Sequence, residues 1–202
     1  MEGSIFNTKF QQNSITSKIV VGLERISEAF KGILWEHAKV IGLSPTQIQI
    51  LIFIAYHKTK LCNVSHLAKE FNITKPTVSD AVRVLNNKKY IIKDYSLTDG
   101  RSYSILLSEL GKKTVLETDK FANPLKDHLN GLKETDLEIV FESLTTLIYQ
   151  LNKTGILSVQ RSCFSCNFLT KYENKNYCNL LKKELISSDI RLDCPEHEVA
   201  IL

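Results

Sequence analysis

Four cysteines in the last forty residues have the type and spacing of a metal site. Cys163 and Cys166 form a C-x2-C pair, and Cys178 and Cys194 follow after eleven and fifteen intervening residues. A C-x-x-C pair lets two thiolates reach one metal from a single tight turn, and two further cysteines complete a set of four soft ligands. We therefore expect these four thiols to bind a metal.

The kind of metal stays open at the level of sequence. A two-knuckle zinc ribbon normally has two C-x-x-C pairs, and only one is present. Pro195 directly follows Cys194, and a terminal Cys-Pro with wide spacing is typical of 4Fe–4S ligands. Thiolates suit zinc and iron–sulfur clusters alike. His197 is either a substitute ligand or simply a surface residue. Four free thiols are the simpler interpretation, and a reducing cytosol disfavours disulfides. Aromatic residues able to shield a cluster from water are Phe164, Phe168, Tyr172 and Tyr177.

A second set of polar residues has the chemistry of a nucleic-acid contact. Residues 58–120 contain twelve Lys or Arg against seven Asp or Glu, although the whole chain has a net charge of only +4. Side chains that donate hydrogen bonds to phosphates and base edges are the means by which proteins bind duplex DNA. The residues of this kind on one expected helix and one expected hairpin tip are Lys75, Thr77, Ser79, Arg83 and Arg101. Asp99 lies two residues before Arg101 and can accept from its guanidinium.

Two capped helices must position these side chains. Ser44, Pro45 and Gln47 form a capping box at the start of an apolar helix over 46–57, which we expect to be buried on most sides. Thr74 can cap a second helix that runs to about residue 89. Its inward stripe comprises Val78, Ala81, Val82 and Leu85.

The pattern then changes from helical to alternating. Strands are predicted over 90–95 and 102–107, joined by a turn that contains an Asp-Gly pair. With a short helix over 65–71, the order is helix, helix, two-stranded hairpin, which describes a winged helix-turn-helix of mainly α (α+β) class. Arg101 at the hairpin tip would enter a minor groove, and Asp99 would orient its guanidinium. An exposed ion pair of little energetic worth is the simpler interpretation.

Long helices flank this unit, over 15–41, from 108 toward 129, and over 134–153. The last has a heptad-like seam made of Leu137, Val140, Leu144, Leu147 and Leu151. Intrachain packing is the simpler explanation of such a seam. However, a small winged unit has little core to offer these helices, so we expect a homodimer.

The composition limits the class of protein. With 202 residues, 43% of them hydrophobic and 24% charged, the chain is globular, with a tail over 1–12, a winged-helix and dimerisation domain over 13–153, and a cysteine-rich appendage over 155–202. No apolar run approaches the roughly 20 residues of a membrane span and no secretory signal is visible, so a cytoplasmic location without membrane contact is expected. P-loop, G-x-S-x-G and H-E-x-x-H motifs are absent, which argues against an enzyme.

The sequence resembles the MarR family of bacterial transcription regulators. The matching segments are Leu43-Ser44-Pro45-Thr46-Gln47, Leu67-Ala68-Lys69, residues 73–79, residues 85–92 and, most specifically, Thr98-Asp99-Gly100-Arg101-Ser102-Tyr103-Ser104-Ile105-Leu106-Leu107-Ser108. The resemblance implies a dimer that binds a pseudo-palindromic operator, usually as a repressor. It implies that Thr77, Val78, Ser79 and Arg83 form the recognition-helix face, and that Arg101, supported by Asp99, is the minor-groove residue. Asp80 departs from the family, whose recognition helices often have a basic residue there.

These observations together favour a dimeric, sequence-specific DNA-binding regulator that responds to redox or metal state through its cysteines. The alternative is a redox, electron-transfer or protein-interaction module with a structural zinc or iron–sulfur site and no DNA binding. Cys62, in an apolar context, is expected to be a core residue rather than a sensor. No residue identifies a small-molecule effector.

Overall fold

The computed structural model describes residues 4–96, 103–173 and 175–200. Its α-helices are α1 (Thr8–Gln11), α2 (Ile15–Ile41), α3 (Pro45–Tyr56), α4 (Val64–Glu70), α5 (Lys75–Asn87), α6 (Glu109–Thr118), α7 (Asn123–Leu129) and α8 (Glu134–Lys153). Its strands are β1 (Ile91–Asp94), β2 (Ser104–Leu107), β3 (Leu169–Tyr172), β4 (Lys175–Cys178) and β5 (Lys183–Leu185). Short 3-10 helices are η1 (Thr59–Leu61), η2 (Cys163–Ser165) and η3 (Ser187–Asp189).

Helix α3 is the centre of the winged head, which we define as α3 to α6. The predicted capping box is confirmed: the Ser44 hydroxyl accepts the Gln47 backbone N–H at 3.2 Å, and the Gln47 side chain accepts the Ser44 N–H at 2.9 Å. As expected from its composition, α3 is buried on most sides and packs against α2, α5, α6 and β2. Its buried apolar side chains are Ile48, Ile50, Leu51, Phe53 and Ile54.

The helix-turn-helix and hairpin follow the predicted order. Helices α4 and α5 pack together across a turn in which Asn72 has a φ of 52°, a conformation that asparagine tolerates. Strands β1 and β2 pair antiparallel, with Ile91 opposite Leu107. The backbone N–H of Ile105 donates to the carbonyl of Cys62 at 2.8 Å, so the base of the hairpin is tied to the segment just before α4.

The flanking helices differ from expectation at one place. The expected single helix from 108 toward 129 is wrong, because the chain forms α6 and α7 with a break between Thr118 and Asn123. Pro124 lies in the first turn of α7, where its missing N–H needs no partner, whereas it would interrupt the interior of a continuous helix. Helices α2 and α8 have the predicted extents, and Gly42 ends α2 with a φ of 70°.

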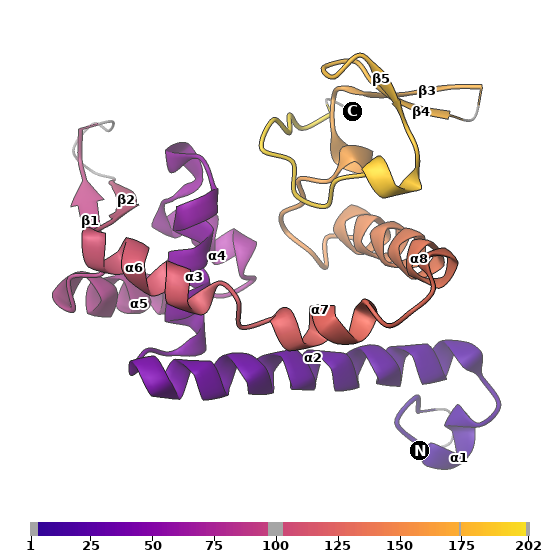
Figure 1. Ribbon diagram of the computed structural model, residues 1–202, viewed down its shortest axis with the longest axis horizontal. Coiled ribbons are helices and arrows are strands. Elements are labelled where there is room, and N and C mark those ends of the chain that lie inside the picture. Colours follow the sequence, from indigo (N-terminus) through magenta and orange to yellow (C-terminus); the bar gives the residue numbers. More distant parts are fainter. Residues whose placement is uncertain (1–3, 97–102, 174, 201–202) are drawn as a thin grey trace.

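In Figure 1, α2 runs along the bottom of the molecule, α7 lies beside it, and α8 separates them from the C-terminal segment. That segment, residues 155–200, is called the cysteine lobe below. It contains the three-stranded antiparallel sheet β3-β4-β5. Phe141 of α8 packs against the lobe's small core, and Tyr149 contacts Phe164 with ring centroids 5.9 Å apart. One side of α8 is thus covered by the lobe.

No single helix in the described part of the chain is long and apolar enough to cross a membrane. Helices α2 and α3 meet such a criterion only as a pair bent by 91°.

Gly111, the third residue of α6, allows a close approach that a larger residue would prevent. A Cβ at this position would overlap the backbone carbonyl of Tyr90, which also accepts the N–H of Ser108 at 3.0 Å. We expect Gly111→Ala to lower the free energy of unfolding by about 1–3 kcal/mol, because α6 must move away from β1.

Urea unfolding followed by circular dichroism measures this change. Gly32→Ala is the matched control, since Gly32 is exposed in α2 with nothing within 4 Å of the added methyl. The control is expected to be neutral or to stabilise by up to about 1 kcal/mol. Equal unfolding midpoints for Gly111→Ala and the wild type would contradict the close approach.

Candidate functional site

Helix α5 presents one polar side and buries the other. The hydroxyl of Thr74 accepts the Thr77 N–H at 3.3 Å and lies 2.8 Å from the Thr77 hydroxyl, which fixes the first turn as the sequence predicts. The buried stripe is the predicted one, Val78, Ala81, Val82 and Leu85. The exposed residues include Lys75, Thr77, Ser79, Asp80 and Arg83.

Val78 does not belong to this exposed face. Its side chain is fully buried in the core of the head, so the expectation that it contacts DNA is wrong. At 100° per residue, Val78 falls on the same side of the helix as Ala81, Val82 and Leu85, which anchor α5 to the rest of the head. Its role is to hold α5 in place rather than to read bases.

Asp80 and Arg83 are joined on the exposed face of α5. The Arg83 guanidinium donates to the Asp80 carboxylate at 2.9 Å, and both side chains are about two-thirds exposed. An exposed pair of this kind contributes little to stability. It does place an acid beside the only guanidinium of α5, so the departure from the family noted above occurs within the candidate interface.

The hairpin lies next to α5, but its predicted tip residues Asp99 and Arg101 fall outside the described residues. Near the last described pair of the hairpin, the Lys93 ammonium lies 4.6 Å from the centre of the Tyr103 ring, and the Tyr95 and Tyr103 rings are 5.4 Å apart. These contacts join the two sides of the hairpin at Asp94 and Ser104, which are opposite each other.

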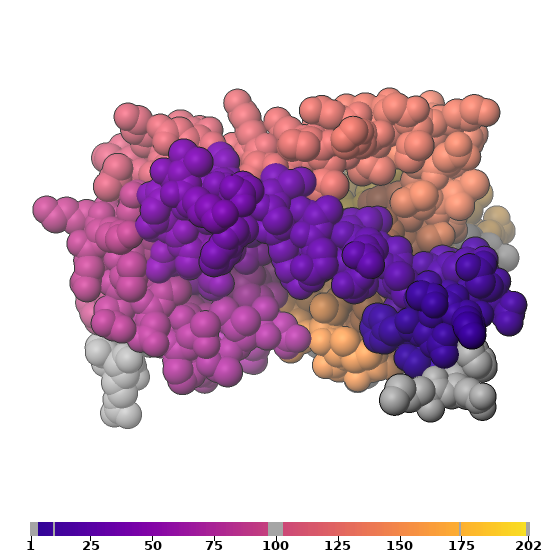
Figure 2. Space-filling view, turned by 90° about the horizontal axis from the view of Figure 1, so that it is seen from below, coloured from indigo at the N-terminus to yellow at the C-terminus, as the bar shows by residue number. Residues whose placement is uncertain are grey.

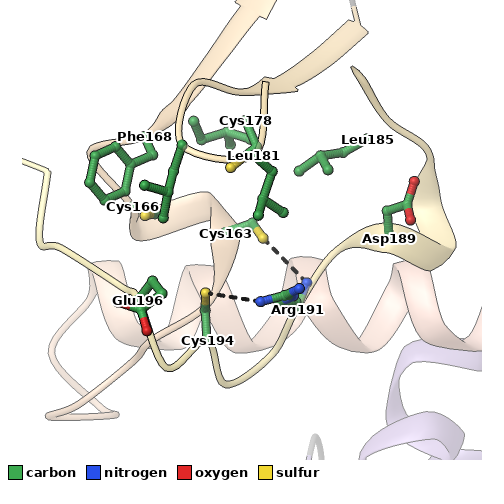
Figure 3. A pocket seen from close by; sticks show the side chains of 12 residues that line it. Cys163, Cys166, Phe168, Cys178, Leu181, Leu185, Asp189, Arg191, Cys194 and Glu196 are labelled. Atoms are coloured by element: carbon green, nitrogen blue, oxygen red, sulfur yellow. Dashed lines mark hydrogen bonds between the residues drawn. The ribbon is translucent and has the colours of Figure 1, made fainter. Parts of the chain in front are cut away.

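The four C-terminal cysteines surround one cavity of about 40 Å³. Figure 3 shows Cys163 and Cys166 on the turn at η2, Cys178 at the end of β4 and Cys194 on the C-terminal segment, all around the same space. Segments up to 31 residues apart in sequence therefore bring their thiols to one place, as the metal hypothesis requires. The remaining wall is mostly apolar and includes Leu180, Leu181 and Leu185.

Two hydrogen bonds to sulfur border this cavity. The Arg191 backbone N–H donates to Cys163 Sγ at 3.3 Å, and the Arg191 guanidinium lies 3.8 Å from Cys194 Sγ. Burial raises the pKa of the Cys163 thiol, the Arg191 N–H lowers it, and the three neighbouring cysteines raise it again. Among the described residues, no group of three or more His, Cys, Asp or Glu side chains is placed so that it could hold a metal ion, and the metal stays a prediction.

Several expected neighbours of the cluster lie elsewhere. Of the four predicted shielding aromatics, Phe168 lines the cavity, whereas Phe164 packs on Tyr149 of α8. His197 faces away, with its Nε2 atom 3.0 Å from the Ser165 hydroxyl. The leucines of the cavity wall were not anticipated, because two adjacent leucines after a cysteine give no distinctive pattern.

Cys62 is separate from this cluster. It is 1% exposed in the core of the head, and burial raises the pKa of its thiol to about 11. A thiol with this pKa is protonated at neutral pH and is a weak nucleophile, which agrees with a core role.

A charged cluster between the lobe and the head was not predicted by any sequence pattern. It is centred on Arg161, which lies 91 residues from Glu70 in the chain and 32 from Asp193. Burial alone would raise the pKa of the Asp193 carboxyl, but hydrogen bonds from Arg161 and His57 hold it below its ordinary value. No local motif could have predicted contacts over such separations.

Comparison with known proteins supports the winged fold. Residues 41–102 match the model of the MarR family. The S. aureus MepR–DNA complex is similar at 25% identity and a TM-score of 0.56, over 64% of this chain and 94% of that one. A MarR transcriptional regulator from Methanosarcina mazei Go1 has 20% identity and a TM-score of 0.59, over 67% and 97% of the two chains. A MarR protein from Peptoclostridium difficile has 18% identity and a TM-score of 0.57, over 70% and 90%.

The likenesses below 25% identity bear on the fold alone, and they confirm the mainly α winged helix-turn-helix. No curated protein is significantly similar to the chain in sequence. About a third of the chain lies outside the similarity to MepR.

Proposed function

We propose, from the premise that this chain is a winged-helix protein of the MarR family, that it is a sequence-specific DNA-binding transcriptional regulator. The similar protein from Methanosarcina mazei Go1 is described as a MarR transcriptional regulator. The observation that supports the proposal most directly is the polar outer side of α5 over a fully buried inner side. A regulator of this kind acts where the DNA is, in the cytoplasm.

Helix α5 has the form of a recognition helix. In a helix-turn-helix, the second helix enters the major groove and its N-terminal residues face the base edges. Thr77 and Ser79 lie in this half of α5 and are exposed. Lys75 and the free N–H groups of the first turn suit a phosphate. Asp80 either accepts from a cytosine amine or releases Arg83 to a phosphate when DNA binds.

The hairpin supplies the second contact in this proposal. Arg101 is the residue for the adjacent minor groove and Asp99 its support, on the strength of the family's wing motif. Together, α5 and the hairpin of one head would contact two neighbouring grooves of the DNA duplex.

A homodimer completes the operator contact. Two heads related by a two-fold axis read half-sites one helical turn apart, which is why such operators are pseudo-palindromic. Exposed apolar side chains are consistent with a second copy: Ile139 is 64% exposed and Val140 43%, on the helix that holds the predicted seam. Helix α2, which crosses the face seen in Figure 2, also has exposed apolar side chains, among them Ile15 at 71% and Val40 at 86%. Repression by occupying the promoter is the simplest outcome.

The cysteine lobe would make the regulator responsive to metal or redox state. Cys163, Cys166, Cys178 and Cys194 are the proposed ligands of one zinc ion or one 4Fe–4S cluster. The buried apolar side chains of the lobe's described part are Cys163, Leu185 and Ile190. So small a core does not hold a fold of this size by itself, and a metal would supply the missing constraint.

DNA contact by α5 can be measured with duplexes selected from a random pool by the wild-type protein. Lys75→Ala should weaken binding to all of them and reduce the slope of log affinity against log salt by about one, since one phosphate contact is lost. Arg101→Ala should cost about 1–3 kcal/mol and relax the base preference at one position. Lys31→Ala, in the exposed Lys31–Glu28 pair of α2, is the control and should change neither quantity. Unchanged affinity in both test variants would refute the proposed interface.

The dimer can be tested on the seam of α8. Leu144 and Leu147 are each nearly 40% exposed in the single chain, and burying a carboxylate between two copies is strongly unfavourable. The double variant Leu144→Glu/Leu147→Glu is expected to sediment as a monomer and to lose affinity for two-half-site DNA by more than about tenfold, through loss of avidity. Thr146→Glu adds the same charge on another side of the helix and should stay dimeric. A dimeric double variant would show that the seam is not the interface.

Metal content separates the interpretations of the lobe. Protein purified without oxygen should contain either one zinc or four irons per chain, and only the iron–sulfur form should be brown. Cys178→Ser should lose that metal and unfold the lobe at a lower temperature, whereas Cys62→Ser should keep the full content. Metal-free wild-type protein with an intact lobe would contradict the metal proposal.

A further inference from the structure

The cysteine lobe touches the winged head at one highly connected residue, Arg161. Its guanidinium donates to both carboxylate oxygens of Glu70, at 2.7 and 3.0 Å, and to both of Asp193, at 2.6 and 3.1 Å. It also lies over the Phe53 ring, 5.4 Å from the ring centre. The Arg161 side chain is only 12% exposed, so these bonds are formed away from bulk water, where they are stronger than at the surface.

The residues that Arg161 contacts in the head lie in helices α3 and α4. Glu70 is the last residue of α4, the first helix of the helix-turn-helix. Phe53 lies in the buried helix α3, and His57, which follows α3, stacks on Phe53 and binds Asp193 at 2.8 Å. A displacement of Arg161 therefore acts directly on the end of α4, two residues before the Asn72 turn that sets the direction of α5.

On the lobe side, the same contacts are built into the cysteine segments. Arg161 and Asp193 are paired in a parallel bridge. Cys163 comes two residues after Arg161, and Cys194 directly follows Asp193. The N–H of Cys194 donates to the Arg161 carbonyl at 3.0 Å, and the N–H of Cys163 donates to the Arg191 carbonyl at 3.1 Å. Two of the four cavity thiols, Cys163 and Cys194, thus belong to the two segments that this bridge aligns. The same alignment places the Asp193 carboxylate beside the Arg161 guanidinium.

We propose that Arg161 is the positioning residue through which the state of the four-cysteine cavity reaches the helix-turn-helix. A metal held by Cys163 and Cys194 fixes the 161–163 and 191–194 segments side by side, and so keeps Asp193 and Glu70 on one guanidinium. Loss of the metal releases that alignment, and the end of α4 loses its anchor. The inference rests on the proposed function, in which α5 reads DNA and the lobe binds a metal.

A second, weaker contact between lobe and head does not explain the coupling equally well. Lys58 and Glu196 pair at 2.9 Å, but both side chains are about half exposed. Exposed ion pairs such as this one contribute little free energy to holding two elements together. Arg161, with four short bonds and little exposure, is the stronger link.

The test compares the DNA affinity of metal-loaded and chelator-treated full-length protein, on a duplex selected by the wild type. The wild-type ratio of affinities is expected to be about tenfold, within the usual range of coupling between sites. Arg161→Gln removes the charge and the bidentate bonds, and its ratio should fall below about twofold while its metal content stays at the wild-type level. Lys175→Gln, which breaks only the exposed Lys175–Glu184 pair of the lobe, should keep the wild-type ratio.

Glu70→Gln provides the second arm, since it removes the carboxylate charge and one of the two Glu70 oxygens that accept from Arg161, and it leaves every lobe residue in place. It should also reduce the ratio below about twofold, and it decides the matter if Arg161→Gln fails to hold metal. Amide hydrogen exchange of DNA-free protein gives an independent readout: metal removal should speed exchange in α4 of the wild type but not further in Glu70→Gln. Wild-type ratios in both variants would overturn the role of Arg161 and leave the proposed regulator intact. If the wild type binds no metal, or if its DNA affinity does not depend on metal, both the proposed responsiveness and this inference are overturned.

Discussion

Helix α3 must be buried on nearly every side, and the head is arranged to satisfy that requirement. Five of its apolar side chains are buried, and a helix that is apolar all round is stable only inside a core. The end of α2, the inner side of α5, helix α6 and strand β2 each cover part of it. Because the same surfaces also fix α5, the demand for burial in α3 determines which side of α5 remains free for a ligand.

Local signals were sufficient to predict most of the head. Ser44, Thr74 and Gly42 act through hydrogen bonds or dihedral angles within a few residues, so the sequence alone indicated where helices begin and end. The break before Pro124 was missed, because the apolar spacing continued across it. Val78 was assigned both to the core and to the DNA face, and burial shows that only the first is correct.

The cysteine lobe was only partly predictable, for a different physical reason. The cysteine spacing indicated a common site, and the four thiols do line one cavity. However, the wall residues Leu180, Leu181 and Leu185 and the partners of Arg161 come together through tertiary contacts with no repeating local pattern. A small lobe of short strands is specified by such distant contacts, and these are the contacts that periodicity and capping cannot reveal.

Helix α8 has almost no interior of its own: Thr145 is its one buried residue in the described chain. One side of α8 packs against the cysteine lobe through Phe141, and the leucine seam lies on another side of the helix. In the proposed dimer, α8 contacts both the cysteine lobe of its own chain and the second copy of the chain. Thermodynamic reciprocity then requires that self-association favour ligand uptake by the lobe as much as uptake favours self-association. The affinity of the lobe for its ligand would then depend on the concentration of the protein. A cell with few copies of the chain would therefore respond at a different ligand concentration from a cell with many copies.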